Sequence, residues 1–465
     1  MSTSPDSRIA PTRVRYGVLI FVCLLSMITY IDRAWFPNAE KEVGKSLGLT
    51  DISDLAIALA AFQLAYALFE IPTGWLGDVY GPRKTLIRIV IWWSTFIAIT
   101  GLVGMSIFGV TLIGFWVLVG IRFLFGMGEA GAYPNITRAL YNWFPSGERG
   151  FAQGAVWMSA RFMGGLTPLI WLFVVDYLGV HWRVSFGLFG LVGVIWCLAF
   201  LAFFRNRPEE HPSVNAAEIE YIRAGGTNAD NAHAAVPWKK LFLSANLWAL
   251  CGMYFCMNYG WYFFMYYLPS FMVGQFNASV DPETATFGQK VVNKLITGSP
   301  LLLGMVGCLL GGWLSDRHIR KTGDRRWGRR TYGMIGFGMA SLSFAVIVFG
   351  PQTALVFAVC IACAGFFNDL ALATCWATAQ DMGRRYAAIV AGCMNMIGNL
   401  GGALTTAVTG WIVASYIKGL SGDELELARN AAYRINFMLF GSVYFIGMLL
   451  WLRIDASKPV IPEAE

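Results

Sequence analysis

Apolar runs of about 20 residues fill most of the chain and recur about twelve times between Tyr16 and Leu452. A helix of about 20 apolar residues crosses the hydrocarbon core of a bilayer, so each run predicts a transmembrane helix. The longest polar interruption covers residues 205–240, with about six runs on either side. The pattern predicts an all-α membrane protein with twelve transmembrane helices in two six-helix bundles, residues 1–204 and 241–465. Residues 205–240 would form a central linker with one short, solvated helix in the segment AAEIEYIRAG.

Composition supports a membrane protein. The 465 residues are 56% hydrophobic and 14% charged, and the mean hydropathy is +0.55. A chain of this length and composition has more hydrophobic residues than one soluble core can bury. The first run follows Arg13 and Arg15 as in a signal peptide, but it continues past Asp32 without a small-residue cleavage site. We therefore interpret it as a retained helix.

The net charge of +7 reflects orientation in the membrane rather than a nucleic-acid partner, because the basic residues gather at alternate helix ends. The positive-inside bias places these segments and both termini in the cytoplasm. The basic segments include Arg13, Arg15, Arg83, Lys84, Arg138, Arg149, Arg329, Arg330, Arg384 and Arg385. The opposite ends carry Glu40, Glu42, Glu424 and Glu426.

Cysteine and histidine usage argues against enzyme, metal or redox chemistry. All nine cysteines lie in apolar runs, and we interpret the CxxC pair Cys360 and Cys363 as packing residues. The four histidines lie in loops or at helix ends, so any proton coupling must use carboxylates. No metal-ligand cluster or nucleophile with a base is apparent in the spans. We expect no catalytic residues, no metal and no cofactor.

A short motif occurs twice, once in each half. Gly-Trp-Leu-x-Asp runs from Gly74 to Asp78 and again from Gly312 to Asp316. Basic residues follow both copies, and the motif residues outside the pentapeptides are Gly81, Arg83, Lys84 and Arg317. The glycines allow close helix packing, each aspartate can cap a neighbouring helix, and the basic residues anchor the turn at the surface. Two copies at matching positions indicate a duplicated transporter.

Arg122 and Glu129 lie in an otherwise apolar stretch, seven residues apart, so they share one helix face. Charges at bilayer depth are costly and most often line a polar pathway. Ionised Glu129 would hold Arg122 in a charge-assisted pair, and protonated Glu129 would release the guanidinium to a substrate carboxylate. The alternative is a buried ion pair that only fixes helix packing.

The segment from Gly74 to Lys84 resembles the loop signature of the major facilitator superfamily. Further segments are similar to its anion:cation symporter family: Tyr30-Ile31-Asp32-Arg33, Ile71-Pro72-Thr73-Gly74-Trp75, Arg122 with Gly126, Glu129 and Pro134, Trp143-Phe144-Pro145, and Gly398-Asn399-Leu400-Gly401-Gly402. The resemblance implies the major facilitator fold and a rocker-switch importer of organic anions with protons in a bacterial inner membrane. A sugar acid such as a hexuronate, aldonate or aldarate is the implied substrate, and exchange of organic or phosphorylated anions is the alternative. Nothing in the sequence requires more than a monomer.

By the same resemblance, Asp32 and Glu129 match proton-binding carboxylates, Arg33 and Arg122 their basic partners, and Tyr66 a substrate-contacting tyrosine. Adjacent helical residues point about 100° apart, so Asp32 and Arg33 cannot both face one cavity squarely. Glu70 is interpreted as a gate or interfacial residue near the cytoplasmic end of its helix rather than as a proton site.

Two pairs of polar residues share a helix face at a spacing of four and could meet substrate hydroxyls. Asn258 and Tyr262 lie in an aromatic seventh span that ends in Leu268-Pro269, and packing or interfacial belts would also explain that span. Asn395 and Asn399 lie among glycines in the eleventh.

Three positions depart from the sugar-acid transporter pattern. Arg161 stands where the galactonate group carries a glutamine, Asp369 adds a carboxylate in the tenth span, and Trp35 replaces an asparagine. We expect Arg161 to be a second anion-binding residue with Asp369 as a possible partner. Separate solvation of the two charges by cavity water is the alternative.

Overall fold

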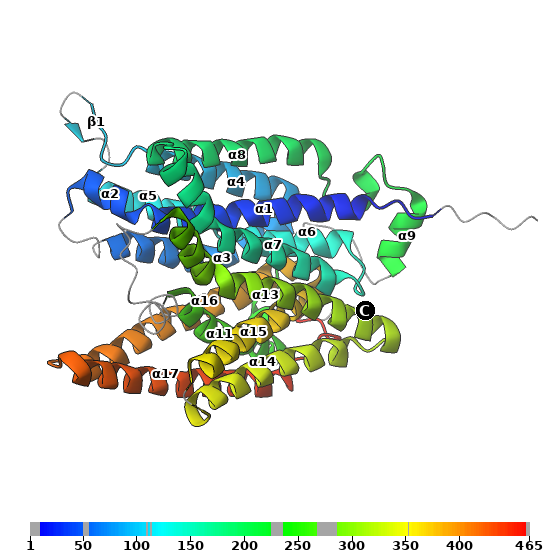
Figure 1. The fold of residues 1–465 in the computed structure, drawn as a ribbon. Helices are drawn as coiled ribbons and strands as arrows, with labels where there is room; N and C mark the ends of the chain where they lie inside the picture. The colour runs from blue at the N-terminus through cyan, green and yellow to red at the C-terminus, as the bar shows by residue number, and fades with distance from the viewer. Residues whose placement is uncertain are drawn as a thin grey trace, which may run out of the picture.

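The structure is a computed structural model, and it describes residues 10–49, 55–107, 110–111, 114–224, 236–266, 286–351 and 353–461. Nearly all of these residues are helical (Figure 1). Among them, eight stretches are long and apolar enough to cross a membrane, and two of these, Phe115–Trp143 and Leu355–Ile417, each contain two α-helices. A two-residue hairpin, β1 (Ser106–Ile107) with β2 (Val110–Thr111), lies outside the helices.

The helices form two groups, which Figure 1 shows one above the other. The first group comprises α1 (Val14–Asn38), α2 (Glu40–Leu47), α3 (Leu55–Tyr80), α4 (Pro82–Thr100), α5 (Phe115–Glu129), α6 (Ala132–Trp143), α7 (Arg149–Trp171) with η2 (Leu172–Tyr177), and α8 (Trp182–Phe203). The second comprises α11 (Ala245–Tyr266), α13 (Phe287–Thr322), α14 (Arg325–Phe349), α15 (Ala354–Gly383), η4 (Arg384–Tyr386), α16 (Ala387–Ile417) and α17 (Gly422–Trp451). With α2 and η4 set aside, and with α5–α6 and α7–η2 each taken as one span, the described residues give the predicted twelve spans.

Glycines allow the two groups to meet closely where α7 contacts α13 and α3 contacts α16. A Cβ atom at Gly312 would lie 2.0 Å from the carbonyl oxygen of Gly150, and one at Gly74 would lie 2.7 Å from that of Ala388. Real side chains do not fit at such distances, so these contacts require glycine. The first glycine of each repeated motif therefore packs against the other group.

The aspartate of each motif caps a helix of the opposite group, as the repeat predicts. Asp78 accepts hydrogen bonds from the amides of Ala388 and Ile389, at 3.2 and 2.8 Å, at the N-terminus of α16. Asp316 accepts from the amides of Gly150 and Phe151, at 3.0 and 2.7 Å, at the N-terminus of α7. A carboxylate at this position satisfies free amides and interacts favourably with the helix dipole. The two caps are equivalent, which supports the duplication.

The basic residues of the motif differ between its copies. Gly81 has φ +86° and precedes α4, whose first turn carries Arg83, while Lys84 is exposed. Arg317 lies within α13 rather than in a turn, because that helix continues to Thr322, and its guanidinium stacks on Trp313 at 5.2 Å. The basic turn after the second copy therefore lies further along the chain, between Arg320 and Lys321 in the last turn of α13 and Arg325 at the start of α14.

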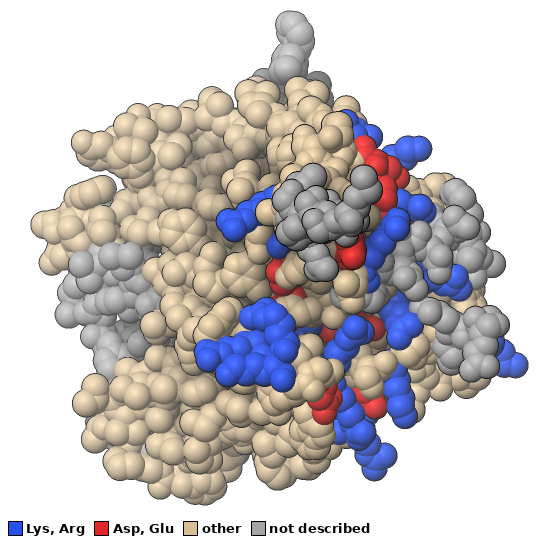
Figure 2. Space-filling model, turned by 90° about the vertical axis from the view of Figure 1, so that its right-hand side faces the viewer, with Lys and Arg blue, Asp and Glu red and all other residues tan. Residues whose placement is uncertain are grey.

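A network of ion pairs, of which Arg149–Asp381 joins the two groups, lies at the end that also holds both described chain termini, here called the terminal end. Arg149 contacts Asp381 at 2.8 Å, and Arg329 contacts Asp381 at 3.0 Å and Asp316 at 2.8 Å. All four side chains are buried. Figure 2 views this end, where Lys and Arg gather with interspersed Asp and Glu.

The described part of the linker includes η3 (Pro208–Glu210), α9 (Ala216–Ala224) and α10 (Trp238–Phe242). The predicted short helix is present as α9, but it is docked rather than fully solvated. Glu218 of α9 is completely buried and accepts from the Arg15 guanidinium at 2.9 Å, from Thr12 at 2.5 Å and from the amide of Val14. The linker is thus attached to the beginning of α1.

Candidate functional site

A cavity of about 480 Å³ lies between the two groups of helices, and α1, α3, α5, α7, α11, α15 and α16 all contribute to its wall. Pro37 and Asn38 at the end of α1 and Glu40 of α2 also line it, so the cavity extends toward the end opposite the termini. The predicted residues on its wall are Arg33, Tyr66, Arg122, Arg161, Asn258, Tyr262, Asn395 and Asn399.

Arg33 is the most accessible of the three arginines that line the cavity. Its side chain is 26% exposed, and its guanidinium lies over the Tyr66 ring at 4.2 Å. Nε of Arg33 donates to Oε1 of Glu129 at 2.6 Å. Glu129 is the last residue of α5, just before Gly131 turns the chain into α6 with φ +81°. Glu129 lies behind the cavity wall, and its second carboxylate oxygen has no hydrogen-bond partner among the described residues.

Arg122 does not pair with Glu129, so that prediction is wrong. Seven residues place both side chains on one face but about 10 Å apart along the axis, and Arg33 of α1 reaches Glu129 instead. The Arg122 guanidinium lies against Phe36, Phe62 and Phe125 at 4.5–5.0 Å. Its Nε and Nη1 are buried and, within the described part of the chain, have no hydrogen-bond partner. Arg122 therefore lies at the cavity wall with two buried donors that have no partner among the described residues.

Asp32 is buried behind Arg33 and does not line the cavity. Neither of its carboxylate oxygens has a hydrogen-bond partner among the residues described, and the group interacts electrostatically with Glu129 and Arg122. This arrangement agrees with the expected divergence of Asp32 and Arg33. Trp35, the third residue that departs from the family pattern, faces away from the cavity and donates to Ser185 at 2.8 Å.

Arg161 and Asp369 form a bidentate ion pair between α7 and α15. Nε of Arg161 donates to Oδ2 of Asp369 at 2.7 Å and Nη2 to Oδ1 at 2.9 Å. Nη1 donates to the Tyr30 hydroxyl at 2.8 Å, and the guanidinium lies 3.6 Å from the Trp261 ring centroid. Arg161 lines the cavity, whereas Asp369 is fully buried behind it. The structure thus forms the possible pair and excludes separate solvation by cavity water.

A polar network crosses the cavity from α11 to α16. The Tyr262 hydroxyl donates to Oδ1 of Asn399 at 2.9 Å and lies 3.3 Å from Oε1 of Gln63 on α3. Asn258 lies on the same wall and packs against Gly398. The four-residue spacing therefore brings both predicted α11 residues to the cavity, while Leu268 and Pro269 lie outside the described residues.

The prediction that Glu70 is an interfacial residue near a helix end is wrong, whereas its interpretation as a gate stays a prediction. It lies in the body of α3, is completely buried, and accepts hydrogen bonds from Nδ2 of Asn395 and, at 3.3 Å, from Nδ2 of Asn399. Asn395 also donates to the Tyr66 hydroxyl at 3.4 Å. The position of a residue along a helix does not reveal which neighbour it meets. Glu70 consequently joins the two groups beneath the cavity wall.

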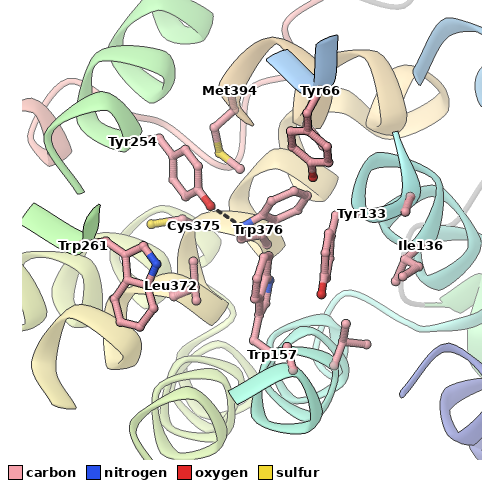
Figure 3. Packing of buried hydrophobic residues seen from close by; sticks show 14 of the residues in the cluster. Tyr66, Tyr133, Ile136, Trp157, Tyr254, Trp261, Leu372, Cys375, Trp376 and Met394 are labelled. Atoms are coloured by element: carbon pink, nitrogen blue, oxygen red, sulfur yellow. Dashed lines mark hydrogen bonds between the residues drawn. The ribbon is translucent and has the colours of Figure 1, made fainter. Parts of the chain in front are cut away.

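Aromatic side chains from both groups pack together next to the cavity, and Trp157 and Tyr254 among them line its wall (Figure 3). Tyr133 stacks on Trp157 at 4.3 Å, and Trp157 lies 5.2 Å from Trp376 of the other group. Nε1 of Trp376 donates to the Tyr254 hydroxyl at 3.0 Å, the contact dashed in Figure 3. Buried aromatic residues in apolar runs carry no distinguishing pattern, so this layer could not be predicted from the sequence.

The arrangement suits a small anion. Three arginines line the cavity together with amides, hydroxyls and one carboxylate, Glu40, whereas the carboxylates of Asp32, Glu129 and Asp369 lie behind the wall. Guanidinium groups bind carboxylates bidentately, and amides and hydroxyls bind polar substituents. Within the described residues, no group of three His, Cys, Asp or Glu side chains could hold a metal ion.

Comparison with known proteins identifies the family to which the chain is similar. The family model described as Major Facilitator Superfamily matches residues 22–406. The chain is similar to the probable sulfoacetate transporter SauU of Cupriavidus necator, with 32% identity covering 95% of this chain and 94% of that protein. It is 28% identical to the probable galactarate/D-glucarate transporter GudP of Escherichia coli K12, over 87% of this chain and 88% of that protein.

A solved structure, the proton:xylose symporter XylE bound to 6-bromo-6-deoxy-D-glucose, superposes with a TM-score of 0.69 at 13% identity. The match covers 94% of this chain and 95% of that one, and at this identity the likeness concerns the fold alone. Fold and family together define a multi-pass membrane transporter rather than an enzyme. The chain belongs to the major facilitator superfamily.

Proposed function

We propose that the protein imports a small organic anion by proton symport across a bacterial cytoplasmic membrane, with both termini in the cytoplasm. One observation carries the proposal: a cavity-lining arginine, Arg33, is held by a carboxylate, Glu129, that lies behind the cavity wall. Protonation of Glu129 would release Arg33, and an anion in the cavity would take its place. Proton binding and anion binding then favour one another.

Residues 1–204 and 241–465 would rock as two units around the cavity, with residues 205–240 as the linker. In the present arrangement the terminal end is closed by the Asp78 and Asp316 caps and by the Arg149–Asp381 pair. With the basic terminal end in the cytoplasm, the cavity would extend outward and receive substrate from outside. Transport would require these contacts to separate.

The proposed substrate is a sugar acid such as a hexuronate, aldonate or aldarate, or a smaller acid of similar polarity. The relatives' names give sulfoacetate and galactarate or glucarate, which are small acidic molecules. Asn258, Tyr262, Asn395 and Asn399 supply amides and a phenol for hydroxyl groups. Asp32 would be a second proton-binding carboxylate, and nothing in the proposal requires more than a monomer.

Purified protein in liposomes tests the proposal. An inward proton gradient should drive accumulation of a labelled acid, glucarate or sulfoacetate, and the external medium should become more alkaline as the acid enters. A proton uncoupler should abolish accumulation. Exchange against an internal anion without a pH change, insensitive to the uncoupler, would instead establish the alternative of an organic-anion or phosphorylated-anion exchanger.

A further inference from the structure

The cavity contains two arginine–carboxylate pairs with the same design. In each pair the arginine lines the cavity and the carboxylate lies behind the wall: Arg33 with Glu129, and Arg161 with Asp369. The first pair lies within the first group of helices. The second joins the first group to the second, from α7 to α15.

Both arginines flank one aromatic ring. The guanidinium carbon of Arg33 lies 6.0 Å from the Tyr30 centroid, and that of Arg161 lies 5.9 Å from it. The two carbons can be no farther apart than these two distances together. A small molecule in this cavity can therefore contact both cations at once.

The two cations differ in what an anion must displace. The side chain of Arg33 is 26% exposed, so an anion can approach its guanidinium from the cavity, and its buried Nη2 has no hydrogen-bond partner among the described residues. Arg161 is 2% exposed, and Asp369 and the Tyr30 hydroxyl occupy its donors. An anion can bind Arg161 only by replacing one of these acceptors, and a second carboxylate or sulfonate matches the geometry that Asp369 now supplies.

We infer that the transported anion is a dianion, with one acidic group at Arg33 and Arg122 and the other at Arg161 in place of Asp369. The inference rests on the proposed function and specifies its substrate class. A monoanion is fully bound by Arg33 and Arg122 and leaves the Arg161–Asp369 pair intact. A dianion breaks this link between α7 and α15, so only the doubly charged molecule removes a contact that holds the two groups together at the cavity.

When an acidic group of the substrate replaces Asp369 at Arg161, Asp369 stays buried without its cation. The charged and titratable groups around it, among the residues described, are Arg161 from α7, Cys308 from α13 and Tyr444 from α17, and Asn368 donates to it at 3.0 Å. None of the other neighbours is cationic, so a displaced Asp369 takes up a proton. Each acidic group of the substrate thus enters with one proton, and dianion uptake leaves the net charge of the carrier unchanged.

Binding to the purified protein tests the inference with matched probes. Glucarate is compared with gluconate, and sulfoacetate with 2-hydroxyethanesulfonate, so that each pair differs in one acidic group. For at least one pair, wild-type protein should bind the dianion at least about tenfold more tightly than the matched monoanion. Asp369→Asn removes the competing carboxylate and should tighten dianion binding further without changing monoanion binding. Arg161→Gln should remove the preference.

Controls separate recognition from general destabilisation. Asp381→Asn disrupts another ion pair between the groups, outside the cavity, and should leave the dianion-to-monoanion ratio unchanged. If Arg161→Gln does not fold, the double variant with Asp369→Asn leaves no unpaired charge and serves in its place. Equal binding within both probe pairs, or a preference that survives loss of Arg161, overturns the inference while proton-coupled uptake of a monoanion still stands. Failure of all four probes to bind the wild type counts against the proposed function itself.

Discussion

Nε of Arg33 donates to Oε1 of Glu129 at 2.6 Å, and this bond crosses from the cavity wall to a completely enclosed carboxylate. Arg33 cannot make this ion pair and bind an anion through the same Nε at once. The state of Glu129 therefore determines how strongly Arg33 attracts an anion. In the proposed function, this single contact would connect the site of proton binding to the site of substrate binding.

Glu129→Gln should imitate the protonated state. We expect anion binding to be kept or strengthened, because Arg33 loses its internal acceptor, while accumulation driven by a proton gradient disappears. Binding by thermal shift and uptake into liposomes measure the two effects separately. Glu220→Gln, the same change on the exposed face of α9, is the matched control. If Glu129→Gln still accumulates the anion normally, Glu129 does not couple protons to transport and has only a packing role.

Arg122→Met should stabilise the empty protein and abolish anion binding. Two buried donors of Arg122 lack partners among the described residues, and each such group costs about 1–3 kcal/mol. Methionine fills the space between Phe36, Phe62 and Phe125 without that cost. The melting temperature without ligand should rise, and the increase caused by an anion should vanish. Arg317→Met, outside the cavity, should retain the ligand effect; a ligand effect that persists in Arg122→Met would remove Arg122 from the site.

Features with a local cause were predictable from the sequence. The spans follow from the lengths of the apolar runs, because the thickness of a bilayer fixes the length of a helix that crosses it. The caps at Asp78 and Asp316 follow from a glycine and an aspartate repeated at the same spacing. The four-residue spacings brought Asn258 with Tyr262, and Asn395 with Asn399, to the cavity, because such residues share a helix face.

Features that depend on partners from other helices were not predictable. Glu129 was assigned to Arg122 on its own helix, whereas Arg33 of α1 takes that place. Glu70 was assigned to a helix end, although it meets Asn395 of α16 in the interior. Helix rotation and neighbours decide both contacts, and a single sequence records neither. Arg161 with Asp369 was anticipated only because two unmatched charges in apolar spans need compensation.

The two caps should differ in strength. Asp316 also contacts Arg329 at 2.8 Å, whereas the nearest arginine contact of Asp78 is to Arg138 at 3.6 Å. Asp316→Asn should therefore loosen the N-terminus of α7 more than Asp78→Asn loosens that of α16, because it also weakens a buried ion pair. Hydrogen exchange measured by mass spectrometry should show faster exchange at residues 150–151 than at 388–389 in the respective variants. Equal acceleration would mean that the cap, not the ion pair, sets the strength of the contact.

Glu70→Ala should destabilise the protein more than Glu70→Gln. Oε1 of Glu70 is the acceptor for amide groups of Asn395 and Asn399, which lie on the opposite group of helices. Alanine leaves these donors without their acceptor and creates a cavity, at a cost of about 1–3 kcal/mol for each unsatisfied group. Glutamine keeps an acceptor oxygen at the same place.

Thermal unfolding in detergent measures the order of stabilities, with Glu220→Ala as an exposed control. Because Asn399 also accepts from Tyr262, the alanine variant should in addition weaken anion binding at the cavity wall. Equal losses in Glu70→Ala and Glu70→Gln would show that the ionised carboxylate, rather than an acceptor oxygen, holds α3 to α16. Unchanged stability in both would show that this contact contributes little to closure beneath the cavity.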